Sequence, residues 1–192
     1  MSQVLGLLLA AGAGRRMGMP KAVVRDEAGV PFVVHAIDVL RNGGCADVTV
    51  VVGAAVGEVR ALAEQRGVRI VHADDWADGM GTSLRVGLLD ALEGEAICAL
   101  VSLVDLPDVG PAVVHRLLER LPRDSTALGR ASYDGVPGHP VMLGRDHWAD
   151  VVESARGDRG ARDYLAAHPP SLVECGDLAT GRDVDSPQDL HG

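Results

Sequence analysis

Residues 1–24 of the chain read MSQVLGLLLAAGAGRRMGMPKAVV, and this stretch decides the fold class. The apolar run Val4–Ala10 is followed at once by a loop that holds several glycines, two arginines and Lys21. A short apolar run that ends at a glycine break is typical of a parallel strand buried on both faces. A secretion signal would carry positive charge before the apolar run, whereas the arginines come after it. The run is also shorter than the roughly 20 residues that span a bilayer, so we expect no membrane partner.

Apolar strands and amphipathic helices alternate through the rest of the chain. The pattern predicts strands at 46–53, 68–72 and 96–103, and a turn followed by a strand at 133–143. It predicts helices at 31–42, 56–67, 82–92, 111–121 and 158–168. Thr82 or Ser83 is suited to cap the helix at 82–92.

Strands that alternate with helices of this length connect through right-handed crossovers and form a mostly parallel sheet covered by helices. The sequence therefore predicts an α/β fold, a three-layer Rossmann-like sandwich. The chain has 192 residues without an internal repeat, a low-complexity tract or a long linker. We expect a single domain over 1–192.

Net charge and cysteine content limit the classes of binding partner and the cellular compartment that we expect for this chain. The formal net charge is −9, which argues against a general attraction to nucleic acid or to an anionic membrane. The three cysteines, Cys45, Cys98 and Cys175, are widely spaced and form no CxxC motif. An odd number of scattered cysteines fits reduced thiols better than a disulfide framework, so we expect a cytoplasmic protein with structural cysteines.

The loop after the first strand fails the tests for two familiar phosphate-binding motifs. A dinucleotide fingerprint needs a third glycine where Met17 stands, and the second strand ends in VVGA without an acid for the ribose. A P-loop needs glycine before its lysine, but Pro20 precedes Lys21. The glycines still let backbone amides approach an anion, and three cations lie nearby. The loop is either a phosphate site of another kind or a solvated turn with basic residues.

Two acidic stretches follow later in the chain. Asp105 lies two residues after the end of the apolar strand at 96–103, where a carboxylate is suited to hold Mg²⁺ against phosphate oxygens or to cap the next turn. Residues 183–190, DVDSPQDL, gather Asp183, Asp185 and Asp189. One of these aspartates would be a second metal ligand; alternatively, Asp185 or Ser186 caps a helix.

Four segments together resemble the MobA-like NTP transferase family over essentially the whole chain. They are LLAAGAGRRMGMPK at 8–21, DDWADGMGTSLRVGL at 74–88, VDLP at 104–107 and DVDSPQDL at 183–190. The resemblance implies a fold of the nucleotide-diphospho-sugar transferase type. It also implies an Mg²⁺-dependent enzyme that transfers a nucleotide and releases pyrophosphate.

A fifth segment is similar to the molybdenum cofactor cytidylyltransferase branch of that family. It is GVPGHPVML at 135–143. The guanylyl branch usually carries a Gly-Gly pair where this chain has Ala11-Gly12, which favours CTP over GTP. The chain departs from the family pattern at Val104, where glycine commonly precedes the metal aspartate, and at Leu106, where methionine is usual.

The resemblance implies a role for each site residue. Asp105 and Asp185 would bind the metal, Arg16 and Lys21 would offset the charge of the departing pyrophosphate, and His139 would lie on the acceptor side. The nucleotide would be bound by Ala10, Ala11, Gly12, Ala13, Gly14, Arg15, Lys21 and Ser83.

The implied reaction moves a CMP unit from CTP to the phosphate of molybdopterin. The implied protein partner is a recipient molybdoenzyme or its chaperone. Two alternatives remain: a transferase of the same fold with another base or acceptor, and a domain that binds a nucleotide without turnover.

Overall fold

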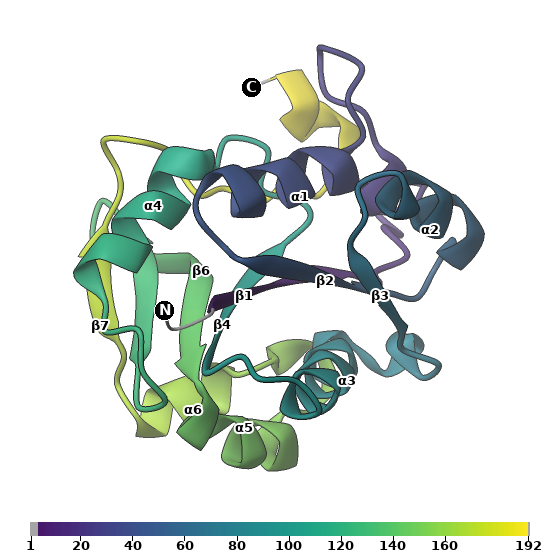
Figure 1. Cartoon of the computed structure of the whole chain (residues 1–192). Coiled ribbons are helices and arrows are strands. Elements are labelled where there is room, and N and C mark those ends of the chain that lie inside the picture. The colour runs from purple at the N-terminus through teal and green to yellow at the C-terminus, as the bar shows by residue number, and fades with distance from the viewer. Residues whose placement is uncertain (1–3, 192) are drawn as a thin grey trace.

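The computed structural model describes residues 4–191, and the strands within this range form one seven-stranded sheet (Figure 1). In spatial order the strands are β3 (Arg69–His72), β2 (Asp47–Val52), β1 (Val4–Ala10), β4 (Cys98–Leu103), β6 (Val136–Gly144), β5 (Leu128–Tyr133) and β7 (Ser171–Glu174). The first four strands are parallel to one another, β6 runs antiparallel to β4 and β5, and β7 is parallel to β5. The predicted mostly parallel sheet is confirmed.

Helices cover both faces of the sheet and make three layers (Figure 1). One face carries α1 (Phe32–Asn42), α2 (Val56–Glu64) and α4 (Pro111–Arg120). The other carries α3 (Met80–Leu92), α5 (Trp148–Ser154) and α6 (Arg162–Ala167). The three-layer α/β prediction from the sequence is confirmed.

The central strand β1 is buried along its whole length, and its side chains alternate between the two layers of helices. Leu8 packs in the cluster that contains Phe32 of α1, whereas Leu7 packs in the cluster that contains Leu88 of α3. Each fully buried leucine stabilises the fold by about 1.5–3 kcal/mol. A Cβ atom on Gly87 of α3 would lie only 2.8 Å from Leu7, so helix and strand pack closely.

The start of α3 corrects a prediction. The helix begins at Met80, its N-cap is Gly79 with φ of 112°, and no side chain caps it, so the predicted cap by Thr82 or Ser83 is wrong. Tertiary packing determines this start instead. A Cβ atom on Gly79 would lie 2.4 Å from the carbonyl carbon of Gly157, and only glycine permits that approach. Ser83 consequently lies within the first turn and is buried.

The second half of the chain differs more from the prediction. The predicted turn and strand at 133–143 are a hairpin of β5 and β6, with its turn at Asp134 and Gly135. The predicted helix at 158–168 is shortened to α6 and is preceded by a 3-10 turn at Gly157–Arg159. The short elements α5 and β7 were not predicted, because α5 has only two helical turns and β7 exposes three of its four residues and so forms no apolar run.

All three cysteines are buried and free, as predicted. Among the described residues, no helix has both the length and the apolar character needed to cross a membrane.

Candidate functional site

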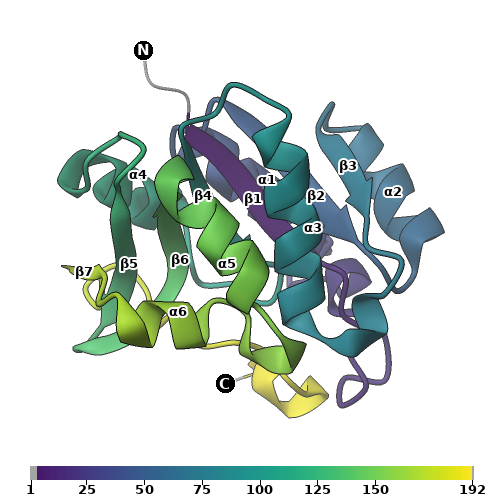
Figure 2. The ribbon, with the colours of Figure 1, turned by 90° about the horizontal axis from the view of Figure 1, so that it is seen from below.

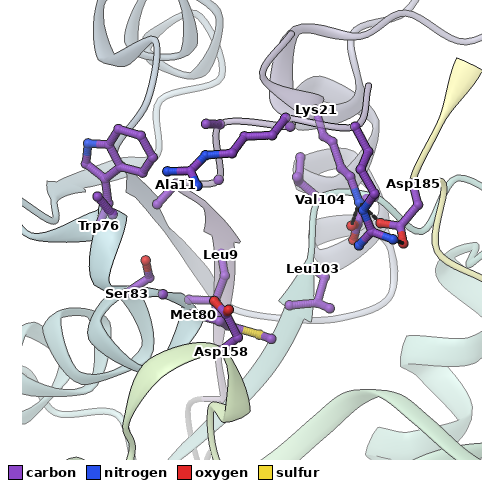
Figure 3. Close-up of a pocket in the computed structure, with 18 residues that line it drawn as sticks. Leu9, Ala11, Lys21, Trp76, Met80, Ser83, Leu103, Val104, Asp158 and Asp185 are labelled. Carbon is purple, nitrogen blue, oxygen red and sulfur yellow. Dashed lines mark hydrogen bonds and ion pairs between the residues drawn. The ribbon is translucent and has the colours of Figure 1, made fainter. Parts of the chain in front are cut away.

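A cavity of about 440 Å³ opens at the ends of β1 and β4, between the loop that follows β1 and the start of α3 (Figure 3). Parallel sheets bind ligands at this carboxyl edge. Ten of the residues that the sequence singled out line the cavity: Ala11, Gly12, Ala13, Gly14, Arg15, Arg16, Lys21, Ser83, Asp105 and Asp185. Ala10 and His139 are not among the lining residues; Ala10 is buried at the end of β1.

The loop after β1 is folded tightly around its glycines. Gly14 has φ of 59°, and a Cβ atom there would lie 2.0 Å from the carbonyl oxygen of Met19. The amide of Gly18 donates a hydrogen bond to the carbonyl of Gly14 (2.9 Å), and Met17 is buried beneath the loop. A Cβ atom on Gly12 would meet nothing within 4 Å, so the backbone at Gly12 faces open space. The loop therefore has one glycine that the fold requires and another that leaves room for a ligand.

Lys21, the chain's single lysine, lies between two carboxylates at one side of the cavity (Figure 3). Its Nζ donates to Oδ2 of Asp105 (2.7 Å) and to Oδ1 of Asp185 (2.5 Å). Arg16 contacts the other oxygen of Asp185 (2.7 Å). Burial lowers the pKa of Lys21, but the hydrogen bonds and charges of Asp105 and Asp185 outweigh it, so this pKa is raised above its ordinary value. Lys21 is therefore a fixed cation in the free protein.

The C-terminal segment brings two further aspartates to Asp105. The amide of Val184 donates to the carbonyl of Asp105 (2.9 Å), which fixes this segment beside the end of β4. Asp105, Asp183 and Asp185 each present an oxygen within 4.8 Å of the others. Asp189 has a different position, because its carboxylate accepts hydrogen bonds from Ser186 and from the amide of Asp185. The predicted alternative, a cap from Asp185 or Ser186, is replaced by this turn around Asp189.

The cluster contains one oxygen that is buried and unpartnered in the described structure. Among the described residues, Oδ1 of Asp105 is buried without a hydrogen bond. Burying an unpaired carboxylate oxygen is costly, and a divalent cation that prefers oxygen ligands relieves that cost. The three carboxylates thus fit a hard metal ion such as Mg²⁺.

The opposite side of the cavity is formed by Trp76, Ser83 and Met80 (Figure 3). Trp76 lies in a 3-10 turn (Trp76–Asp78) and packs on the backbone of Gly53, where a Cβ atom would be 2.5 Å from the indole. Trp76 thus both packs on the end of β2 and lines the cavity. Trp148, the other tryptophan, is fully buried and donates its indole N–H to the carbonyl of Leu143.

Asp158 also lines the cavity and had no signal in the sequence. It lies in the turn that follows α5, far along the chain from the other lining residues. The close packing of Gly79 on Gly157 brings it there. A pair of glycines that touch in space leaves no pattern that a single sequence would reveal.

Comparison with known proteins identifies the family. A family model described as the MobA-like NTP transferase domain matches residues 6–172. The chain belongs to this family. Nicotine blue oxidoreductase from Paenarthrobacter nicotinovorans is 35% identical over 98% of this chain and 95% of that protein. The probable molybdenum cofactor guanylyltransferase of Natronomonas pharaonis is 27% identical over 99% and 96% of the two chains.

Solved structures of similar shape agree with the fold. The Rv0371c homolog from Mycobacterium sp. strain JC1 superposes with a TM-score of 0.81 at 27% identity, over 97% of this chain and 92% of that chain. The order of the strands and these similarities confirm the nucleotide-diphospho-sugar transferase type of fold.

In this MobA-like chain, His139 lies on β6, beside the cavity and outside its lining. Its side chain is half-buried, and its carbonyl accepts a hydrogen bond from the hydroxyl of Tyr133 (2.7 Å). Burial, together with the nearby charge of Arg130, lowers the pKa of His139 to about 4. The imidazole is therefore neutral at physiological pH.

Proposed function

We propose that this protein is an Mg²⁺-dependent nucleotidyltransferase that moves a CMP unit from CTP to the phosphate of a molybdopterin-type acceptor and releases pyrophosphate. The observation that supports it most strongly is Oδ1 of Asp105, which is buried without a hydrogen bond from any described residue, in a cluster that also holds Lys21, Arg16 and Asp185. A domain that only binds a nucleotide has no evident need for that carboxylate. The proposed domain is the whole chain, 1–192.

The donor phosphates would lie along the loop after β1. Amides near Gly12 have open space beside them, which lets phosphate oxygens approach the backbone closely. Ala11, Ala13, Gly14 and Arg15 line the same wall, while Ala10 supports it from the end of β1. Arg16 and Lys21 would turn from Asp185 toward the β- and γ-oxygens and offset the charge that grows as pyrophosphate leaves.

Asp105 and Asp185 would hold Mg²⁺, and Asp183 is a further available oxygen ligand. When bound, the cation would neutralise phosphate charge and orient the triphosphate. In the free protein, Lys21 occupies one oxygen of each ligand, and repulsion between the cation and the ammonium group would favour release of Lys21 from at least one of them. The release frees its ammonium group for the triphosphate.

The nucleoside would lie toward Ser83 and Trp76, on the side opposite Lys21. Trp76 offers a flat apolar surface for the base, and Ser83 a hydroxyl for the base or ribose. The preference for CTP rests on Ala11-Gly12, and the molybdopterin acceptor rests on the segment at 135–143, with His139 on that side. A cytoplasmic location and a recipient molybdoenzyme or chaperone remain part of the proposal.

A second candidate function comes from the similarity to nicotine blue oxidoreductase, which is 35% identical over nearly the full chain. The name of that relative denotes a redox activity. The loop of this chain lacks the third glycine of a dinucleotide fingerprint, which speaks against a Rossmann-type nicotinamide site. The two functions need different substrates and are separated directly by assay.

The test is pyrophosphate release with Mg²⁺ and CTP, GTP, ATP or UTP, each with and without molybdopterin. Release that needs both CTP and molybdopterin is the expected result. Release with GTP instead would keep the reaction and overturn the base preference. In parallel, the decay of nicotine blue absorbance is followed with NADH or NADPH. Redox turnover without any pyrophosphate release would overturn the transferase proposal.

A further inference from the structure

Arg130 lies in the middle of β5 and has no acidic partner. Its Nε donates to the carbonyl of Gly138 (2.9 Å) on the neighbouring strand β6, which fixes its position. The side chain is half-buried, and within residues 4–189 no carboxylate lies within ion-pair distance of it. A half-buried guanidinium without a counter-charge is unusual, because burial disfavours the charged form.

Helix α6 covers the face of the sheet to which Arg130 points. Arg130 is the direct partner of Val141 in the β5–β6 register, so the two side chains share a face. Val141 packs in the same apolar cluster as Tyr164 and Leu165 of α6. The helix begins at Arg162, which is exposed and also forms no ion pair in the described part of the chain.

Arg130 and Arg162 are near enough for the charge of one to affect the pKa of the other. Burial lowers the pKa of Arg130, and the charge of Arg162 lowers it further. The charge of Arg130 in turn contributes to the lowered pKa of His139. Six arginines of the described chain do form ion pairs with carboxylates, as Arg116 does with Asp177 (2.5 Å). Repulsion between two uncompensated guanidinium groups is relieved when an anion lies between them.

This pair lies next to the proposed active site. Strand β6 pairs with β4, and Val101 is opposite Val141. Two residues further along each strand are Leu103, which lines the cavity, and His139. Figure 2 shows α6 across the lower parts of β5 and β6, at the same end of the molecule as the loop that follows β1. An anionic group there would be adjacent to the nucleotide and separate from the triphosphate loop.

We infer that Arg130 and Arg162 bind a phosphate group of the acceptor substrate, with His139 as a neutral hydrogen-bonding neighbour. The planar fork of a guanidinium matches the oxygens of a phosphate, and two forks with no acidic partner provide the charge. This inference rests on the proposed transferase function and names the chemical class of the acceptor. The same chemistry would suit the pyrophosphate product, and the experiment separates the two sources.

The test measures binding of a simple phosphate monoester, glycerol 3-phosphate, by ³¹P NMR line broadening on the full chain. The triphosphate loop is first filled with Mg²⁺ and an excess of a methylene-bridged, non-hydrolysable CTP analogue. We expect the monoester to bind in the presence of the analogue. The variants Arg130→Gln and Arg162→Gln should each weaken this binding about ten-fold, while Arg120→Gln, at the exposed end of α4, should not.

Arg162→Gln is the decisive variant, because Arg162 is exposed and its loss does not threaten folding. Binding of the monoester that is unchanged in Arg162→Gln and in a folded Arg130→Gln would overturn the inference. Displacement of the monoester by the CTP analogue would also overturn it and assign the anion to the triphosphate loop. If the analogue itself fails to bind but the monoester binds through both arginines, the transferase proposal fails while the anion site stands.

Discussion

The Nζ atom of Lys21 lies 2.7 Å from Oδ2 of Asp105, while the other oxygen of this carboxylate is buried and accepts no hydrogen bond from any described residue. One carboxylate thus holds a cation with one oxygen and keeps the other available. This asymmetry suits a residue that exchanges an ammonium partner for a metal ion. It also makes the site sensitive to changes that leave the fold intact.

Replacing Asp105 by Asn should abolish turnover without unfolding the protein. The amide keeps the shape of the side chain but removes the charge that the metal needs, so we expect pyrophosphate release to fall about a thousand-fold or more. Asp47→Asn is the matched control, because Asp47 is exposed at the start of β2 and forms no ion pair among the described residues. It should lose less than about ten-fold. Turnover near the wild-type rate in Asp105→Asn would remove Asp105 from the mechanism.

Because Lys21 is the chain's single lysine, its rate of acetylation can be measured without interference from other lysines. Lys21 is held by Asp105 and Asp185, and its pKa is raised, so less free amine exists at a given pH. We expect acetic anhydride at mildly alkaline pH to modify Lys21 several-fold more slowly than it modifies N-acetyl-lysine amide, measured by peptide mass spectrometry.

Asp185→Asn should accelerate this modification, because it removes one of the two carboxylates that hold the ammonium group. Glu153→Gln, at an exposed position of α5, is the control and should leave the rate unchanged. A wild-type rate equal to that of the free amine would contradict the arrangement around Lys21.

Gly12 and Gly14 of the loop after β1 should respond differently to alanine. Gly12→Ala meets nothing within 4 Å, so the protein should melt at the wild-type temperature, yet the new methyl group would enter the space proposed for phosphate. We expect the KM for the nucleotide to rise about ten-fold. Gly14 has φ of 59°, and a Cβ atom there would collide with the carbonyl oxygen of Met19. Gly14→Ala should therefore lower the free energy of unfolding by about 1–3 kcal/mol. The comparison fails if Gly12→Ala destabilises as much as Gly14→Ala.

Glu174 should make the fold sensitive to acid. Its carboxylate accepts hydrogen bonds from the hydroxyl of Ser132 and from the amides of Gly176, Gly135 and Asp134, which together lower its pKa from 4.5 to about 2. A lowered folded pKa stabilises the protein above pH 4.5, and this contribution disappears as the pH falls toward 2.

Glu174→Gln should therefore lower the Tm by a few degrees at pH 7, and by progressively less below pH 4.5. Thermal melts followed by circular dichroism between pH 7 and pH 3 would measure the difference. Glu153→Gln again serves as the control, since Glu153 forms no ion pair in the described structure. A difference in Tm between Glu174→Gln and wild type that stays constant over this pH range would contradict the role of the charge.

Most of the first half of the fold could be predicted from the sequence, because apolar strand segments and amphipathic helix segments alternate there in a regular order. Val4–Ala10 was predicted to the residue. The start of α3 could not be predicted in the same way, since Gly79 is fixed by contact with Gly157 and not by a local cap. Local patterns cannot report contacts between residues that are distant in the chain.

The residues of the candidate site also fall into two groups, those that stand in local sequence motifs and those that are positioned by tertiary packing. Arg16, Lys21, Asp105 and Asp185 stand in recognisable motifs, and the fold brings them together. Asp158 and the pairing of Arg130 with α6 depend on how the second half of the chain packs, and short elements such as α5 give no periodic signal. Site residues that belong to local motifs could be predicted from the sequence, whereas residues that tertiary packing brings to the site could not.

The change of strand direction between β4 and β6 divides the molecule along a seam. If the proposed function and the inferred anion site are both right, the donor nucleotide would bind on the parallel side of this seam, and Arg130 and Arg162 would bind the acceptor on the hairpin side. Replacing the segment that contains β5, β6 and α6 would then change the acceptor that is bound, while the residues that bind the nucleotide stay the same. A chimera that carries this segment from another family member should keep its nucleotide and acquire the acceptor of the segment's source.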